Sequence, residues 1–167
     1  EYSAATYTMN VSVNAAPVAV DDTDSITAGA SAQSGNVVTN DTDSDDNTSD
    51  MTIIGVAAGA EGSTLANENV GSAVSGTYGT LTLNSDGSYS YDVTGNAATI
   101  ALAEGATATD TFSYKVNDDE TNAGSKALDI GAITFTVTGI NEVVTATDDN
   151  ITINTKDESI TVTNGSS

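Results

Sequence analysis

The sequence contains no cysteine, histidine, tryptophan or arginine, and only three lysines and one proline among its 167 residues. Without cysteine, the fold must be stable without disulfides or thiolate metal sites. A serine nucleophile activated by histidine, thiol chemistry and arginine clamps are all excluded as well. A pair of carboxylates could still hydrolyse a glycosidic bond, but acidic residues occur throughout the chain and no pair stands out. We therefore expect a protein that is not an enzyme.

Basic charge is almost absent, because 24 acidic residues face three lysines and the net charge is -21. Phosphate binding needs basic groups, so nucleic acids and anionic membrane surfaces are excluded as partners. No apolar run approaches the length that a bilayer requires, and direct membrane insertion is not expected. Self-repulsion of this size is relieved either by an acid-rich, salt-adapted surface or by bound divalent cations. The acids are clustered along the chain, which favours cations.

Thr, Ser, Asn, Asp, Gly, Ala and Val dominate the rest of the composition, and they favour strands and turns over helices. Alternating apolar residues predict strands, with one short helical turn within 97–105 and a long connection at 58–77. The predicted strands are 18–27, 35–40, 51–57, 78–84, 88–94, 109–116 and 126–138. The sequence thus predicts an all-β fold, an antiparallel β-sandwich of about seven strands. Its inward residues include Leu81, Leu83, Tyr89, Tyr91, Val93, Phe112, Tyr114, Val116, Ile133, Phe135 and Val137.

The chain repeats its own opening. Asn14 and Asn141 are 127 residues apart, as are Asp21 and Asp148, and Asp22 and Asp149. We infer a repeat of about 125 residues that allows small insertions. Residues 1–14, with a strand at 5–13, would be the last strand of a preceding repeat; 15–140 a complete repeat; and 141–167 the first strands of the following one. Alternatively, both terminal segments add strands to the central domain.

The acids gather at one end of the predicted sandwich. If successive strands alternate in direction, the turns that carry acids share one end, while the long connections at the other end carry few. The acids at the first end include Asp21, Asp22, Asp41, Asp43, Asp45, Asp118 and Asp119. Calcium takes six to eight oxygen ligands and suits such a group. The loop 41–50 is not an EF-hand, because Asp46 replaces its glycine and Thr52 its glutamate. The alternatives are a solvated acidic loop and, for Asp118 and Asp119, an ordinary turn.

Three segments together resemble a known family: GTYGTLTLNSDGSYSYDVT, LAEGATATDTFSYKVNDDE and ITFTVTGIN. They are similar to the VCBS and cadherin-like repeats of giant RTX-type bacterial adhesins, over about residues 11–150. The resemblance implies an Ig-like or cadherin-like sandwich. It also implies a chain of such repeats, stiffened by Ca2+, secreted by a type I system to the bacterial cell surface.

Carried over from the resemblance, the metal-ligand candidates are Asp21, Asp22, Asp41, Asp43, Asp45 and Asp118. Asn141, Asp148 and Asp149 would serve the next junction. The family's N-D-x-P motif is replaced by NEVV at 141–144 and by NAAP at 14–17. Glu142 can substitute for the missing aspartate, whereas Ala15 cannot.

Two functions follow as expectations. The first is a structural extender repeat of a secreted, calcium-dependent adhesin, rigidified by Ca2+ at the inter-repeat junctions. The alternative is a ligand-binding module of the same protein, for a carbohydrate or a protein. The expected partners are neighbouring repeats of the same chain, with host or surface ligands bound through other domains, and we expect a monomer.

Overall fold

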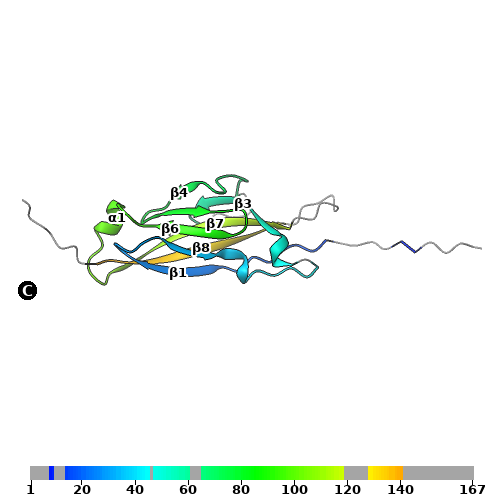
Figure 1. Ribbon diagram of the computed structural model, residues 1–167, viewed down its shortest axis with the longest axis horizontal. Coiled ribbons are helices and arrows are strands. Elements are labelled where there is room, and N and C mark those ends of the chain that lie inside the picture. Colours follow the sequence, from blue (N-terminus) through cyan, green and yellow to red (C-terminus); the bar gives the residue numbers. More distant parts are fainter. Residues whose placement is uncertain (1–7, 10–13, 46, 61–64, 119–127, 141–167) are drawn as a thin grey trace, which may run out of the picture.

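Two four-stranded sheets pack face to face and bury the alternating apolar side chains between them (Figure 1). The computed structural model describes residues 8–9, 14–45, 47–60, 65–118 and 128–140. All statements about structure below concern these residues.

The first sheet has the order β1-β8-β7-β3. Its members are β1 (Asp22–Thr27), β3 (Met51–Ala58), β7 (Thr107–Asp118) and β8 (Leu128–Thr138). The long strands β7 and β8 pair antiparallel along their whole length, and β3 pairs antiparallel with β7. The edge strand β1 runs parallel to β8, with Asp22 opposite Ile133. That pair departs from the antiparallel pattern expected, because β1 and β8 start from the same end of the sandwich.

The second sheet is antiparallel throughout and has the order β2-β6-β5-β4. Its strands are β2 (Gln33–Asn36), β4 (Ala73–Ser75), β5 (Thr80–Leu83) and β6 (Ser88–Asp92). There are two single 3-10 turns: η1 (Val37–Thr39) precedes the acidic loop 41–50, and η2 (Thr48–Asp50) forms its last residues. One helical turn, α1 (Ala97–Ile100), begins at Asn96, whose side chain accepts hydrogen bonds from the amides of Ala98 and Thr99.

The core is aromatic at its centre. The rings of Tyr91 and Phe135 stack across the two sheets, with centroids 4.0 Å apart. Phe112 meets both rings edge-on. The eleven residues predicted to point inward are all fully or partly buried, in agreement with the period-two pattern.

The structure confirms the all-β sandwich and the helical turn within 97–105, and it corrects two details. The predicted strand 35–40 is wrong in its second half: residues 37–39 form η1, because the Asn36 side chain accepts a hydrogen bond from the Val38 amide. The predicted connection 58–77 contains β4, an eighth strand. The predicted strand 5–13 lies outside the described residues apart from 8–9, as do the terminal segments of the proposed domain division.

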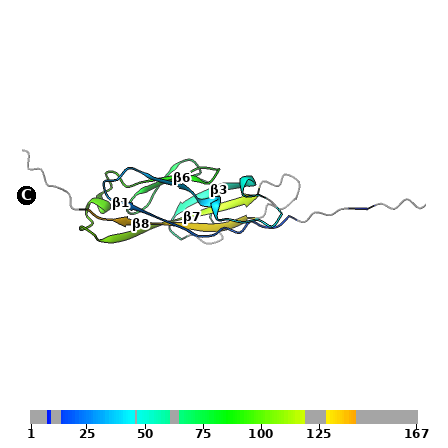
Figure 2. The same cartoon turned by 60° about the horizontal axis from the view of Figure 1, so that its bottom comes forward.

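The chain enters and leaves the sandwich at opposite ends of its long axis (Figures 1 and 2). The segment around Asn14 lies beside Asp118 at the end of β7, whereas the backbone of Gly139 lies beside α1 and bonds Ala106. We call these the acidic end and the helical end. Among the described residues, no helix is long and apolar enough to cross a membrane.

Candidate metal centre

The first group of acids at the acidic end surrounds the incoming segment. The Asn14 side-chain amide donates to Asp118 Oδ2 at 2.6 Å. The backbone amide of Ala15 donates to both carboxylate oxygens of Asp45, each at 3.1 Å. Asp43 closes a local turn, since its Oδ1 accepts from the Asp45 amide at 3.1 Å. The acidic loop and the end of β7 therefore meet around residues 14 and 15.

Several oxygens at the acidic end, in this group and in the neighbouring one, are buried without a hydrogen-bond donor. They are Asn14 Oδ1, Asp41 Oδ2, Asp43 Oδ2, Asn117 Oδ1 and Asp118 Oδ1. Asp118 and Asn117 are only 1% and 3% exposed. Leaving a buried acceptor without a partner costs about 1–3 kcal/mol, and more when it is charged. A bound ion or an ordered water is an ordinary explanation for buried acceptors of this kind.

A second group lies along the start of β1. The amides of Ala19 and Val20 donate to Asp129 Oδ2 (2.9 Å) and Asp41 Oδ1 (2.8 Å). The Ala132 amide on β8 donates to Asp21 Oδ1 at 3.0 Å. These three carboxylates fix the segment before β1 against β8 and the acidic loop, so each has a defined structural role.

Asp22 is the acid of this group that points into the sandwich. The Tyr114 hydroxyl donates to its Oδ2 at 3.0 Å. The Asp22 pKa is raised to about 6. Burial is the largest cause, and the charges of Asp41 and Asp21 act in the same direction, while hydrogen bonds from Tyr114 and Asn40 act against them. Burial also raises the pKa of Asp41, with the charge of Asp129 acting in the same direction. Both carboxylates are thus held where negative charge is unfavourable, which a cation would relieve.

The structure separates the candidates that the sequence had placed together. Asp43, Asp45 and Asp118 are linked through residues 14 and 15, whereas Asp21, Asp22 and Asp41 belong to the second group. Asp119, Asn141, Asp148 and Asp149 lie outside the described residues. Within the part of the chain described, no three His, Cys, Asp or Glu side chains stand close enough together to hold a metal ion. Any metal site there needs amide, backbone or water oxygens as well.

Sequence reasoning missed three members of these groups: Asn14, Asn117 and Asp129. Asn14 had a usable signal, because it occupies the position 127 residues before Asn141, which was selected. Asn117 precedes Asp118 in the segment KVND and was passed over in favour of the carboxylates. Asp129 sits in a strand of alternating residues and carries no local signal.

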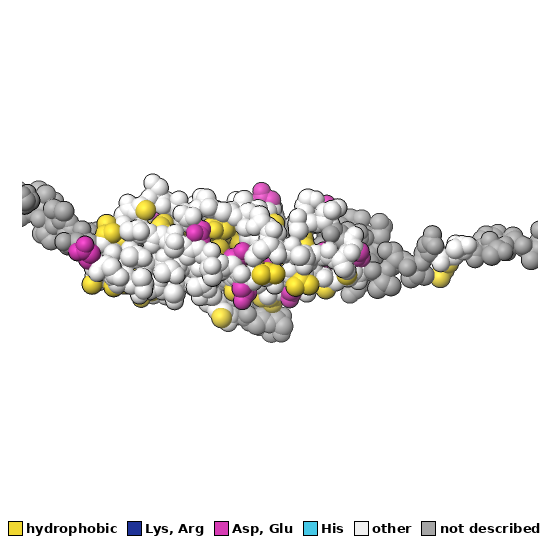
Figure 3. Space-filling model, turned by 90° about the horizontal axis from the view of Figure 1, so that it is seen from below, with side chains coloured by type: hydrophobic (Ala, Val, Ile, Leu, Met, Phe, Trp, Pro, Cys, Tyr) yellow, Lys and Arg dark blue, Asp and Glu magenta, His cyan; other side chains and the backbone are white. Residues whose placement is uncertain are grey.

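The oxygens that lack donors fit a hard cation. All five belong to carboxylates or side-chain amides, which are ligand types that Ca2+ takes. On the face in Figure 3, acidic side chains of the described residues are visible and no lysine is. Lys115, the lysine among the described residues, is buried and donates to Asn67 Oδ1 instead.

Comparison with known proteins agrees with the fold. A sequence model of the bacterial cadherin-like domain matches residues 14–139. The chain is also 33% identical, over 125 residues, to the calcium-binding lectin RapA2 of Rhizobium johnstonii. That match covers 74% of this chain and 49% of RapA2, so the chain spans about half of the relative's length. With the family match covering most of the chain and a sandwich of two sheets built from the matched residues, this chain belongs to the bacterial cadherin-like domain family.

Proposed function

We propose that this chain is a calcium-stiffened extender module of a bacterial surface adhesin. The observation that carries the proposal is the set of buried oxygens without donors at the acidic end, where the chain enters the sandwich. In an extender, that end is the junction with the preceding module. A cation bound there would join the incoming segment to the domain body.

The residues that would hold Ca2+ are Asn14, Asp43 and Asp118. Each has a buried oxygen with no donor, and the bond from Asn14 to Asp118 ties the incoming segment to β7. Asp45, which accepts from the amide of Ala15, holds the loop against the same segment. Calcium supplies positive charge that offsets the repulsion between these carboxylates and fixes the direction in which the segment leaves the domain.

The path of the chain supports an extending role. Entry at the acidic end and exit at the helical end place successive modules along one axis (Figure 1). The strand β8 alone has 11 residues, and at about 3.3 Å per residue it spans roughly 35 Å between these ends. Tandem copies would therefore lengthen the protein rather than form a compact cluster.

The comparisons support the calcium and adhesion parts of the proposal. The relative is described as a calcium-binding lectin, and neither it nor the family is described by a catalytic activity. We accordingly propose a non-catalytic, secreted module at the bacterial surface, exported by the type I route that the family resemblance implies. Its partners would be neighbouring repeats of the same chain, and the module itself would be monomeric.

Thermal unfolding tests this function. The chain is unfolded in EDTA, in millimolar calcium, and in magnesium at matched ionic strength. A single site at ten times its dissociation constant adds about 1.4 kcal/mol, which for a domain of this size raises the melting temperature by roughly 5 °C. We expect that rise with calcium only. An equal rise with magnesium or plain salt would mean that cations only screen the surface charge of the acids, and it would overturn the proposal.

A further inference from the structure

Large hydrophobic side chains are exposed at the two ends of the sandwich and not along its sides. Among the described residues, they are Val18, Val20 and Leu128 at the acidic end, Ile100 and Ile140 at the helical end, and Met9 in the incoming segment. Leu128 is the first residue of β8, and the described strands carry no other. Single exposed apolar side chains are ordinary, whereas apolar side chains that gather in one place mark interaction surfaces.

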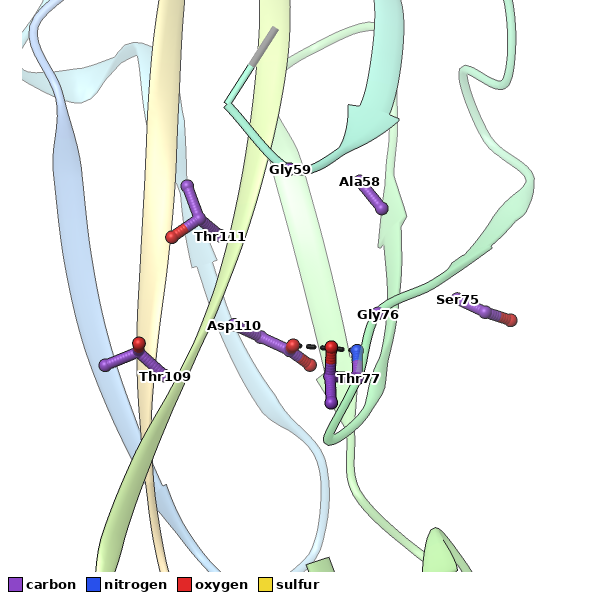
Figure 4. Close-up of a pocket in the computed structure, with 8 residues that line it drawn as sticks. All are labelled: Ala58, Gly59, Ser75, Gly76, Thr77, Thr109, Asp110 and Thr111. Atoms are coloured by element: carbon purple, nitrogen blue, oxygen red, sulfur yellow. Dashed lines mark hydrogen bonds between the residues drawn. The ribbon is translucent and has the colours of Figure 1, made fainter. Parts of the chain in front are cut away.

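The sides of the sandwich are polar by comparison. The outward positions of the edge strand β1 are Thr23, Ser25 and Thr27, which are all exposed. The hollow where β3 and β4 end and β7 begins is lined by small and polar residues (Figure 4). Its carboxylate, Asp110, already accepts a hydrogen bond from the Thr77 amide at 2.8 Å. Neither feature offers a large apolar side chain to another molecule.

At the helical end, backbone contacts fix the point where the chain leaves the domain. The Gly139 amide donates to the Ala106 carbonyl oxygen at 2.8 Å, and the Gly139 carbonyl oxygen accepts from the Gly105 amide at 3.0 Å. Ile140 follows directly, and its Cδ1 lies 3.0 Å from where a Cβ on Gly29 would stand. Ile140 therefore packs on the turn after β1 and still has 37% of its surface exposed. The direction of exit is thus set without the acids of the other end.

At the acidic end, the three exposed apolar side chains lie together. Val18 and Val20 flank Ala19, whose amide donates to Asp129 Oδ2 at 2.9 Å, and Leu128 precedes Asp129 in β8. This hydrogen bond brings the segment before β1 beside the start of β8. The acidic end therefore presents an apolar border next to its carboxylates.

We propose that the helical end of one module packs on the acidic end of the next. The contact residues are Ile100 and Ile140 of the first module, and Val18, Val20 and Leu128 of the module that follows it. This inference rests on the proposed extender function and adds to it an apolar contact between modules that needs no metal.

The path of the chain and its charge select this partner. Ile140 is followed directly by Asn141, which corresponds to Asn14, so a following repeat begins next to the exposed isoleucine. Two acidic ends would repel each other, which leaves the helical end as the surface that an acidic end can approach. A contact between two different surfaces extends a chain instead of closing a pair, in agreement with an extender.

Linkage makes a small contact sufficient. Two modules joined without a spacer present their ends to each other at an effective concentration in the millimolar range. A contact that is too weak to join separate chains therefore forms within one chain. This accounts for ends that carry apolar side chains on a module that is itself monomeric.

The test uses a tandem chain in which residues 1–140 are followed by residues 14–167, so that Asn14 of the second copy replaces Asn141. The sequence has no cysteine, so Thr23→Cys in both copies places one spin label on each module. Distances between the labels are measured by pulsed electron paramagnetic resonance, in calcium and in EDTA, in samples frozen from a temperature at which both modules are folded. We expect one narrow distance distribution in both buffers. A broad distribution in both would overturn the proposal.

Two matched variants assign the contact to these residues. Ile100→Ser with Ile140→Ser in the first copy removes the apolar pair from the junction, and the width of the distance distribution in EDTA should at least double. The same two substitutions in the second copy, which is followed only by residues 141–167, are the control and should leave the width unchanged. An unchanged width in the first variant, or equal broadening in both, would contradict the assignment.

The two buffers separate this inference from the calcium proposal. If the distribution is narrow only in calcium and the isoleucine substitutions do not change it, the apolar contact is absent while the calcium function stands. If the first-copy variant alone broadens the distribution and the melting temperature does not respond to calcium, the apolar contact stands while the calcium function fails.

Discussion

The hydroxyl of Tyr91 donates to Asp110 Oδ2 at 2.7 Å, directly behind the aromatic stack at the centre of the core. Two more tyrosine hydroxyls donate to a carboxylate: that of Tyr114 to Asp22 Oδ2 at 3.0 Å, and that of Tyr89 to Asp24 Oδ2 at 2.6 Å. Burial and the neighbouring carboxylate raise the pKa of each of these tyrosines, so all three remain protonated donors. The sandwich therefore uses acids for internal bonding as well as at its acidic end.

Asp110→Asn should be among the more destabilising single substitutions in the chain. Asp110 is 4% exposed and accepts from three backbone amides and one hydroxyl, and an asparagine amide group would oppose some of these donors. We expect a loss of about 2–4 kcal/mol in the free energy of unfolding, measured in urea. Tyr91→Phe removes only one of the four bonds and should cost about 1 kcal/mol. Equal costs for the two variants would contradict the role given to Asp110.

Gly131→Ala tests how closely the Tyr114 ring packs against the backbone of Gly131. A Cβ at Gly131 would stand 2.5 Å from the Tyr114 hydroxyl and ring end, closer than packed atoms allow. We expect a loss of about 1–3 kcal/mol, the usual cost of overpacking a core. In the Tyr114→Leu background the ring is gone, so the same glycine substitution should cost much less. Additive effects in this double-mutant cycle would show that the two residues do not interact.

Much of the fold is predictable from the sequence, because a half-buried strand repeats with period two. Tyr91 and Phe135 alternate with polar residues in their strands, and the structure buries both, as the pattern predicts. The strand β4 escapes prediction because it has three residues, one of them partly buried, too few to show a period. The turn η1 escapes because Val37 and Val38 look like strand residues, and the Asn36 side chain decides the local geometry.

The candidate site is less predictable, because it is made by contacts between segments distant in the sequence. The spacing of the acids in the loop 41–45 indicates that they could bind one ion together. It does not indicate that Asp41 accepts a hydrogen bond from the Val20 amide while Asp45 accepts one from the Ala15 amide. Nor does the sequence show that the Asn14 side chain donates a hydrogen bond to Asp118, 104 residues later in the chain. Composition predicts the chemistry of the acidic end, and only the folded chain divides its acids into two groups.

Stability without divalent metal should fall as the pH rises from about 4 to 6. The pKa of Asp22 is near 3.8 in the unfolded chain and about 6 in the folded one, so the folded state binds the proton more tightly. The favourable contribution is complete below pH 3.8 and is lost as the pH passes 6. The effect is modest, since Asp22 is only half-buried and water screens its charge.

Asp22→Asn isolates that contribution from the rest of the acidic surface. Asparagine keeps an acceptor for the Tyr114 hydroxyl and removes the titrating group. In EDTA, the free energy of unfolding of the variant should decline less between pH 4 and 6 than that of the natural chain, and the variant should be the more stable of the two above pH 6. If the free energies of unfolding of the two proteins change with pH in parallel, other carboxylates cause the pH dependence.

Asp118→Asn should have opposite effects with and without calcium. Asp118 Oδ1 is buried with no donor, and an amide group in its place could donate to the equally unpartnered oxygen of Asn14. In EDTA we therefore expect the variant to be as stable as the natural chain or more so. In calcium the variant lacks a charged ligand, and the stabilisation of about 1.4 kcal/mol expected for one site at ten times its dissociation constant should largely disappear.

The matched control for this reversal is Glu104→Gln, which removes one negative charge at the helical end, where Glu104 is exposed. If calcium acts only by screening the net charge, the two variants should lose the same small part of the calcium response. If Asp118 holds the ion, only its substitution lowers the response, and isothermal titration shows a weaker or missing site. A calcium response in Asp118→Asn equal to that of the natural chain would remove Asp118 from the site.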